Sequence, residues 1–360
     1  MNEIKILHCA DLHIGAELSA LGAYAAGRRA EILNTLGKIV SLCRDRQIRL
    51  LMIAGDLFDS NAVPEETVRS VRSLLRSIPN TKVAIVPGNH DYLSADSPYR
   101  EDWGENIHIF RKCENINVDG VTLHGIPFTG AFCDAVPLPS ANGGTNILLM
   151  HADLDGGPYN PVTPSRLAAT GMDYIALGHV HKATPIMKCD GACYAYSGCP
   201  EPLGFDECGP KGVYIGTVRK GGCELDFLPL SRREYRAVSL DLSDCQDNAE
   251  ALTLAKSLLK GQGEHLIKLQ LCGECGFAPD TEYIKTGLEN DVFYLKVADC
   301  TYPAADLEIL QNEQSLKGFF VRNMLARAEN AEQQDENVLL KALRLGLAAF
   351  DGREVGISEN

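Results

Sequence analysis

The sequence contains no long apolar run and no excess of positive charge. None of its apolar stretches approaches the roughly 20 residues that a membrane-spanning helix requires, so a membrane protein is excluded. The opening residues, MNEIKILHCADLH, lack the basic region, apolar region and cleavage site of a secretory signal peptide. These absences predict a cytoplasmic protein.

Basic residues are the minority, with 34 against 48 acidic residues and a net charge of -14. This balance excludes a protein that coats nucleic acid through bulk positive charge. It leaves open an enzyme that meets nucleic acid through bound metal ions or through a basic partner.

A disulfide framework is also absent, because the 13 cysteines are odd in number and scattered along the chain. We expect them to be free thiols in a reducing compartment. Cys272 and Cys275 are the one pair at zinc-knuckle spacing, and no second pair follows at matching spacing. Incidental thiols are therefore the expected interpretation, with a structural zinc site as the alternative.

Strand and helix signals alternate in the first third of the chain. Apolar runs at 4–9, 49–54 and 82–86 are separated by helical patterns at 25–47 and from Pro64 onward. This βαβαβ order predicts a parallel sheet. Short strands then lie between turns, which predicts a second, largely antiparallel sheet packed on the first with helices outside. The strands expected in it are 121–126, 146–150, 174–177, 193–197, 212–218 and 223–229.

The pattern restarts after residue 232. Residues 233–302 alternate strands and helices like a small α/β unit, and residues 303–360 are helical, with an acidic break at 329–336. The predicted fold is therefore α/β: a two-sheet αββα sandwich over 1–232, a small α/β capping domain over 233–302 and C-terminal helices over 303–360. The helices at 316–328 and 338–350 either dock on a partner or form a hairpin packed on the chain's own core.

Metal-capable side chains follow five of the predicted strands. In open α/β sheets, ligand sites lie outside the carboxyl ends of the strands, so these side chains are expected to meet. A single zinc ion needs only three or four ligands, and this larger set suggests two ions, with Asp56 able to bridge them. Carboxylate, amide and imidazole ligands suit Mn²⁺, Fe²⁺ or Zn²⁺. The candidates are Asp11, His13, Asp56, Asn89, His90, His151, His179 and His181.

The ordered motifs carry a resemblance to a known family. Asp-Leu-His at 11–13, Gly-Asp-Leu-Phe-Asp at 55–59, Gly-Asn-His-Asp at 88–91, His151 and Gly-His-Val-His at 178–181 resemble the calcineurin-like metallophosphoesterase superfamily. The first two motifs are similar to those of nucleases of the SbcD type. Further motifs are most similar to the bacterial YhaO-like branch. These are Tyr-Asn-Pro at 159–161, Tyr-Ser-Gly at 196–198 and Gly-Pro-Lys-Gly at 209–212.

The resemblance implies a role for each matching residue. Asp11, His13, Asp56 and His181 would bind one ion. The second ion would be bound by Asp56, Asn89, His151 and His179. His90 would contact the scissile phosphate and help to protonate the leaving oxygen, and Asp91 would orient its ring. Asp59 stands where archaeal members carry a second histidine.

The implied activity is that of a Mn²⁺-dependent DNA exonuclease in DNA repair, with Fe²⁺ or Zn²⁺ as alternative ions. Endonuclease activity would require an SMC-like ABC ATPase with coiled coils, SbcC-like or YhaN-like, and a homodimer is also compatible. Residues 233–302 would sit beside DNA. One alternative is a phosphodiesterase of cyclic nucleotides or other small phosphodiesters. An inactive scaffold is the other, and the complete ligand series argues against it.

Overall fold

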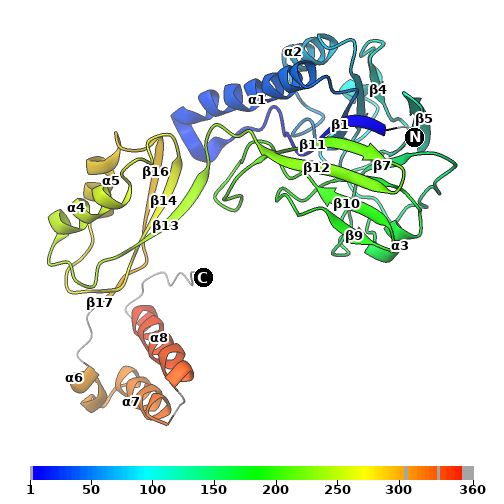
Figure 1. Cartoon of the computed structure of the whole chain (residues 1–360). Helices are drawn as coiled ribbons and strands as arrows, with labels where there is room; N and C mark the ends of the chain where they lie inside the picture. Colours follow the sequence, from blue (N-terminus) through cyan, green and yellow to red (C-terminus); the bar gives the residue numbers. More distant parts are fainter. Residues whose placement is uncertain (1–2, 304–306, 331–332, 351–360) are drawn as a thin grey trace. The chain divides into compact units, whose positions relative to one another are not determined.

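The computed structural model describes residues 3–303, 307–330 and 333–350 (Figure 1). The chain divides into two compact units, Met1–Glu234 and Tyr235–Asn360, which are described separately. In the part of the chain that the structure describes, every helix is too short or too polar to cross a membrane.

The first unit contains a six-stranded sheet with the order β12-β11-β1-β2-β3-β4. Strands β1 to β4 are parallel, and β11 pairs antiparallel with β1. The strands are β1 (Glu3–Cys9), β2 (Leu50–Ala54), β3 (Lys82–Val86), β4 (Ile107–Ile109), β11 (Gly212–Arg219) and β12 (Gly222–Pro229).

A second six-stranded sheet faces the first and has the order β5-β6-β7-β8-β10-β9. Its four central strands are parallel, and only the two edge strands run antiparallel to their neighbours. The strands are β5 (Glu114–Val118), β6 (Val121–Ile126), β7 (Asn146–His151), β8 (Tyr174–Gly178), β9 (Met187–Cys189) and β10 (Ala192–Tyr196).

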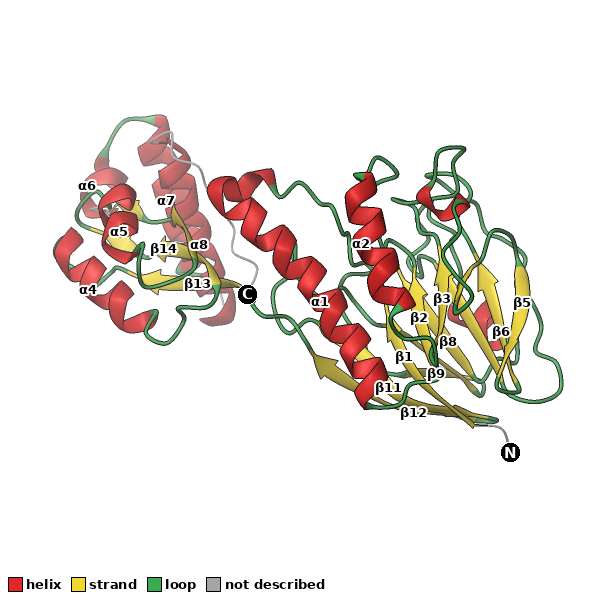
Figure 2. Ribbon diagram, turned by 90° about the horizontal axis from the view of Figure 1, so that it is seen from above, coloured by secondary structure: helices red, strands yellow, loops and turns green. Residues whose placement is uncertain are grey.

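Side-chain alternation along the strands builds the layers. In β2, Leu50, Met52 and Ala54 face the second sheet, while Leu51 and Ile53 face helices α1 (Ala25–Asp45) and α2 (Glu65–Arg76). Figure 2 shows these two helices lying on the first sheet. The outer face of the second sheet carries the short helix α3 (Pro164–Ala168) and long loops. The predicted αββα sandwich is thus confirmed.

Two details of the sheet prediction were wrong. Residues 212–218 and 223–229 belong to the first sheet, where they extend it beyond β1. The second sheet is mainly parallel, because β6, β7, β8 and β10 run in the same direction. The connections between these parallel strands are loops with little helix. Because the sequence has few helix signals there, its strand pattern resembled that of antiparallel hairpins.

The second unit has a three-stranded parallel sheet, β13-β14-β16, covered by two helices. A helical segment follows it. The elements are β13 (Tyr235–Asp241), α4 (Asn248–Leu258), β14 (Leu266–Cys272), β15 (Glu274–Cys275), α5 (Thr281–Leu288), β16 (Tyr294–Asp299), β17 (Tyr302–Pro303), α6 (Leu307–Asn312), α7 (Leu316–Ala328) and α8 (Gln333–Phe350).

Two features of this unit bear on predictions made from the sequence. Helix α8 begins at Gln333, inside the predicted break at 329–336, of which residues 331–332 lie outside the described part. Cys275 is buried in the apolar core, and among the described residues neither Cys272 nor Cys275 belongs to a cluster of three metal ligands. The boundary predicted between 233–302 and 303–360 stays a prediction.

The two sheets of the first unit approach one another closely at Gly178, where β8 faces β2. A Cβ atom on Gly178 would overlap the carbonyl oxygen of Ala54 and lie 2.9 Å from the Cβ of Ala10. Only a residue without a side chain fits between the sheets at this point.

We predict that Gly178→Ala lowers the free energy of unfolding by about 1–3 kcal/mol, as forced overpacking typically does. The measurement is urea unfolding of both proteins. Gly37→Ala is the matched control: a Cβ on Gly37 meets no atom within 4 Å, and alanine there favours helix α1 by up to about 1 kcal/mol. Equal midpoints for wild type and Gly178→Ala would contradict the close-packing argument.

Candidate functional site

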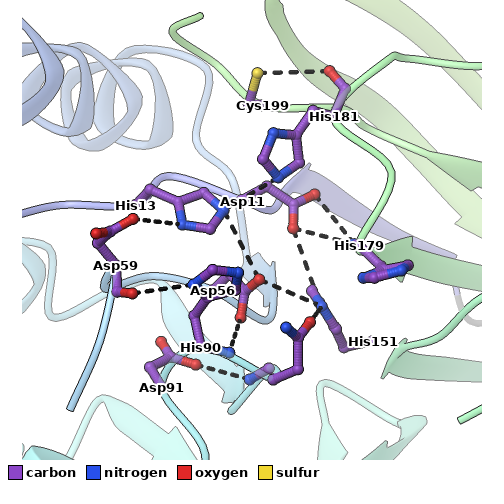
Figure 3. A network of polar contacts seen from close by, with 12 residues as sticks. Asp11, His13, Asp56, Asp59, His90, Asp91, His151, His179, His181 and Cys199 are labelled. Carbon is purple, nitrogen blue, oxygen red and sulfur yellow. Dashed lines mark hydrogen bonds and ion pairs between the residues drawn. The ribbon is translucent and has the colours of Figure 1, made fainter. Parts of the chain in front are cut away.

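Five strand ends, three from the first sheet and two from the second, bring the predicted ligands together (Figure 3). The strands concerned are parallel within each sheet, so their carboxyl ends open on the same edge of the sandwich. The residues delivered there are Asp11 and His13 after β1, Asp56 after β2, Asn89 and His90 after β3, His151 at the end of β7, and His179 and His181 after β8.

The backbone at this edge is strained. Asp11, His13, Asp56 and His179 all have positive φ, at 53°, 44°, 49° and 109°. Such conformations cost on the order of 1–3 kcal/mol each for residues other than glycine, and they cluster at functional sites. The surrounding packing holds four of the predicted ligands in conformations that they would not adopt alone.

His13 and His181 point their Nε2 atoms at one another, 3.1 Å apart. Each ring is fixed from behind, because the Nδ1 of His13 donates to Asp59 Oδ1 at 3.2 Å and the Nδ1 of His181 donates to Glu207 Oε1 at 2.5 Å. Two neutral rings held in this way aim two lone pairs at the same point. A proton or a metal cation that lies between the two Nε2 atoms interacts favourably with both lone pairs.

His151 is fixed by the same principle on the other side of the site. Its Nδ1 donates to the carbonyl oxygen of Ala54 at 2.9 Å, which leaves Nε2 without a proton in the neutral ring. That Nε2 lies 2.8 Å from Asn89 Oδ1 and 3.4 Å from Asp56 Oδ2. Three acceptor atoms therefore converge, which is an arrangement that a cation stabilises.

Asp56 lies between the two groups of histidines. Its Oδ2 is 3.4 Å from His151 Nε2 and 3.7 Å from His13 Nε2, and its Oδ1 accepts the backbone N–H of His90 at 3.0 Å. Gly55 leaves room for the His151 ring beside Asp56, because a Cβ atom on Gly55 would overlap that ring. The position of Asp56 fits the bridging role that was predicted for it.

Asp11 and His179 complete the candidate site. The carboxylate of Asp11 accepts the backbone N–H of His179 at 3.0 and 3.2 Å and lies 3.8 Å from His151 Nδ1. The ring of His179 packs beside those of His151 and Tyr159, with centroid distances of 5.2 and 4.9 Å. All seven predicted ligands thus lie at one edge of the sandwich.

Burial and charge shift the pKa values in this cluster in opposite directions. Burial raises the pKa of Asp11, whereas for Asp56 the nearby His151 and His13 outweigh burial and lower the pKa. Burial opposes protonation of His13, but the Asp59 hydrogen bond and the charges of Asp56 and Asp11 raise its pKa to about 9. Burial, followed by His151, lowers the pKa of His179 to about 4.

His90 lies at the exposed rim of the site, where its Nδ1 donates to the carbonyl oxygen of Asp59 at 3.1 Å. The expectation that Asp91 orients this ring was wrong. Asp91 is buried and accepts the N–H groups of Gly88 and Phe58 and the hydroxyl of Tyr99, so it fixes the loop after β3. Burial and the charge of Asp56 raise the pKa of Asp91 to about 6.

Glu207 was missed by the reasoning from sequence. Besides His181, it accepts the backbone N–H of Leu203 at 2.8 Å and the thiol of Cys199 at 3.3 Å. The ion pair with His181 outweighs burial and lowers the pKa of Glu207. Lys211 supports the same loop, donating to the carbonyl oxygen of His181 at 2.8 Å. The motif at 209–212 marked this segment, but a single glutamate 26 residues after its histidine gives no spacing signal.

The donor set fits divalent metal ions. Within the described residues, four groups of three side chains each offer ligand atoms within 4.8 Å of one another. They combine carboxylate oxygens with imidazole nitrogens, and only one includes a thiol. The groups are Asp11, His13 and His181; Asp11, Asp56 and His151; His13, Asp56 and His90; and His181, Cys199 and Glu207.

Comparisons with known proteins agree with this geometry. The family model of the calcineurin-like phosphoesterases matches residues 4–183, half of the 360-residue chain. The chain is 25% identical over 275 residues to the uncharacterized metallophosphoesterase YhaO of Bacillus subtilis strain 168, covering 69% of this chain and 65% of that protein.

The names of two further relatives refer to DNA repair and to a nuclease. The DNA double-strand break repair protein Mre11 of Methanopyrus kandleri is 27% identical over 66% of this chain and 59% of its own length. The SbcD component of the nuclease SbcCD of Bacillus subtilis strain 168 is 25% identical over 61% of this chain and 67% of its own length. The chain therefore spans less than two thirds of the YhaO and Mre11 proteins.

We predict that purified protein binds two divalent ions per chain and that Asp56→Ala loses both, because Asp56 lies between the two groups of ligands. Metal analysis after dialysis is the measurement, with circular dichroism as a check on folding. Glu65→Ala, which removes an exposed carboxylate of α2, serves as the control and should keep both ions. Retention of two ions by Asp56→Ala would rule out the bridging assignment.

We also predict that Glu207→Gln weakens metal binding about 10–100-fold without unfolding the protein. The amide keeps the shape of Glu207 but accepts the His181 Nδ1 proton poorly, and loss of such partners typically costs this much affinity. Titration calorimetry with Mn²⁺ measures the effect. Cys199→Ser, which keeps a donor to Glu207, is the control. If Glu207→Gln bound Mn²⁺ like the wild type, Glu207 would have a purely structural role.

Proposed function

This chain belongs to the calcineurin-like phosphoesterase family, and we propose that it is a Mn²⁺-dependent DNA exonuclease of the SbcD type. In this proposal it hydrolyses phosphodiester bonds with two metal ions in DNA repair. It would gain endonuclease activity in complex with an SMC-like ABC ATPase that has coiled coils.

The observation that carries the proposal is the common orientation of three histidines. His13, His151 and His181 each donate through Nδ1 to an acceptor outside the site, and each directs Nε2 inward. A histidine that binds a metal ion through Nε2 typically donates its Nδ1–H to a fixed acceptor. Histidines with a purely structural role do not require this shared orientation.

The chain's own residues divide into two ligand sets around Asp56. In the proposal, Asp11, His13 and His181 hold one ion together with Asp56. Asn89, His151 and His179 hold the other, again with Asp56. Bound divalent ions would supply Lewis-acid polarisation of the phosphoryl group and would make a nearby water more acidic.

His90 is proposed to act on the substrate. In the imidazolium form of His90, Nδ1–H donates to the carbonyl oxygen of Asp59, and Nε2–H carries the proton that passes to the leaving oxygen, which leaves the ring neutral. The Asp56 carboxylate also accepts the backbone N–H of His90 at 3.0 Å, which ties the acid to the metal site. Asp59 therefore acts through two contacts, its carboxylate on His13 and its carbonyl on His90.

DNA is the proposed substrate because two relatives are named as a nuclease component and a DNA repair protein. A small phosphodiester would not require the second unit, whose sheet and helices follow the part matched by the family model. Since the net charge is -14, we propose that an ATPase partner supplies much of the duplex-binding surface. Helices α7 and α8 are the proposed docking site for this ATPase. Their exposed apolar residues Leu316, Phe319 and Val338 support this assignment.

His90→Asn should leave both ions bound and slow turnover about 10²–10⁴-fold, since general acid catalysis contributes that much. Stopped-time assays with Mn²⁺, together with metal analysis, test both parts. His108→Asn, which changes a histidine of β4 outside the site, is the control. Metal loss in His90→Asn would make His90 a ligand, as its place near His13 and Asp56 allows, and unchanged turnover would remove it from the mechanism.

The substrate class is tested with linear duplex DNA, closed circular single-stranded DNA and a chromogenic phosphodiester, each with Mn²⁺ and with EDTA. We expect Mn²⁺-dependent shortening of the linear DNA and an intact circle in the absence of an ATPase. Hydrolysis of the chromogenic ester alone would replace the exonuclease by a phosphodiesterase of small molecules. Activity that persists in EDTA would contradict the metal mechanism.

A further inference from the structure

Two aromatic side chains form a ledge that leads from the metal site into solvent. The ring of Phe132 stacks on that of Tyr159 with a centroid distance of 5.7 Å and an interplanar angle of 25°. Tyr159 in turn packs 4.9 Å from the ring of His179. Phe132 is 68% exposed although it is a large apolar residue. Phe132 and Tyr159 are called the aromatic ledge below.

The backbone holds the aromatic ledge in place. Cys133 N–H donates to Pro158 O at 3.1 Å, and Asn160 N–H donates to Cys133 O at 2.7 Å, so the two segments are joined on both sides of Tyr159. The side chain of Asn160 donates to the carbonyl oxygen of His151 at 3.3 Å. The ledge is thereby fixed to the end of β7, which carries a candidate metal ligand.

The stacking contact with Tyr159 still leaves most of the Phe132 side chain exposed to solvent. An apolar side chain of this size gains free energy when it is covered, and a rigid aromatic face is covered best by another flat ring. The nearby loop carries the acidic residues Asp153 and Asp155. These carboxylates repel negatively charged groups. The part of a ligand that covers the aromatic ledge is therefore recognised by its flat face.

We propose that the aromatic ledge stacks an unpaired nucleobase of the strand that is being hydrolysed. This inference rests on the proposed function, because Tyr159 packs on the ring of His179, which is one of the residues proposed to hold the ions that bind the phosphodiester. Stacking on aromatic side chains is how proteins bind single-stranded nucleic acid without reading its sequence. A base on the ledge has left its duplex, so the preferred substrate end is single-stranded or frayed.

The test is a fluorescence titration of the full chain with oligothymidylate that carries one 2-aminopurine, placed near the 5′ end in one probe and near the 3′ end in the other. Ca²⁺ replaces Mn²⁺, and the oligonucleotide is checked to be intact after each titration. Wild type should quench the emission of one probe. Phe132→Ala should lose most of that quenching and bind about tenfold more weakly, and Phe132→Trp should restore both.

A matched probe separates stacking from other contacts. With an abasic site in place of the 2-aminopurine, measured by fluorescence anisotropy, wild type and Phe132→Ala should bind equally. Because Phe132 is exposed, neither variant is expected to disturb folding, and circular dichroism checks this. Equal quenching by wild type and Phe132→Ala, or none by wild type with either probe, would overturn the ledge. Weaker binding of the abasic probe by Phe132→Ala would do the same.

The same oligonucleotides with Mn²⁺ test the proposed function separately. If wild type quenches the probe through Phe132 but never cleaves it, the exonuclease proposal fails and the ledge stands. If wild type cleaves the probe while Phe132→Ala quenches equally, the exonuclease proposal stands and the ledge fails.

Discussion

The hydrogen bond between His151 and Ala54 joins the two sheets at the edge where the candidate site lies. The Nδ1 of His151, at the end of β7, donates to the carbonyl oxygen of Ala54, the last residue of β2. This contact requires the sheets to approach closely, and Gly55 and Gly178 leave the room for it. It also sets the tautomer of His151 and so decides which nitrogen faces Asp56.

His13 and His181 are fixed in the same way by different partners. Asp59 fixes His13, and Glu207 fixes His181, each through Nδ1. These partners lie outside the predicted ligand set, yet they determine where the ligand atoms point. Rigid positioning of this kind places metal ligands before any ion arrives, so that less ordering is required on binding.

The site is held at a cost in backbone strain that the packing around it must offset. Asp11 and Asp56 have positive φ, and both carboxylates are buried close to one another. The buried apolar residues of β1 and β2, packed on both faces, resist relaxation of the strand ends. The candidate site thus lies at the ends of strands that are buried on both faces.

The pattern of apolar runs and polar residues was enough to predict which residues meet. Asp11, Asp56 and Asn89 each follow an apolar run that forms a buried parallel strand, and parallel strands end on the same edge, so local pattern and topology agree. The partner of each residue, in contrast, depends on how distant segments pack in three dimensions. The contact of Glu207 with His181, the role of Asp91 and the place of β11 beside β1 depend on contacts between segments distant in the chain, and no local periodicity records them.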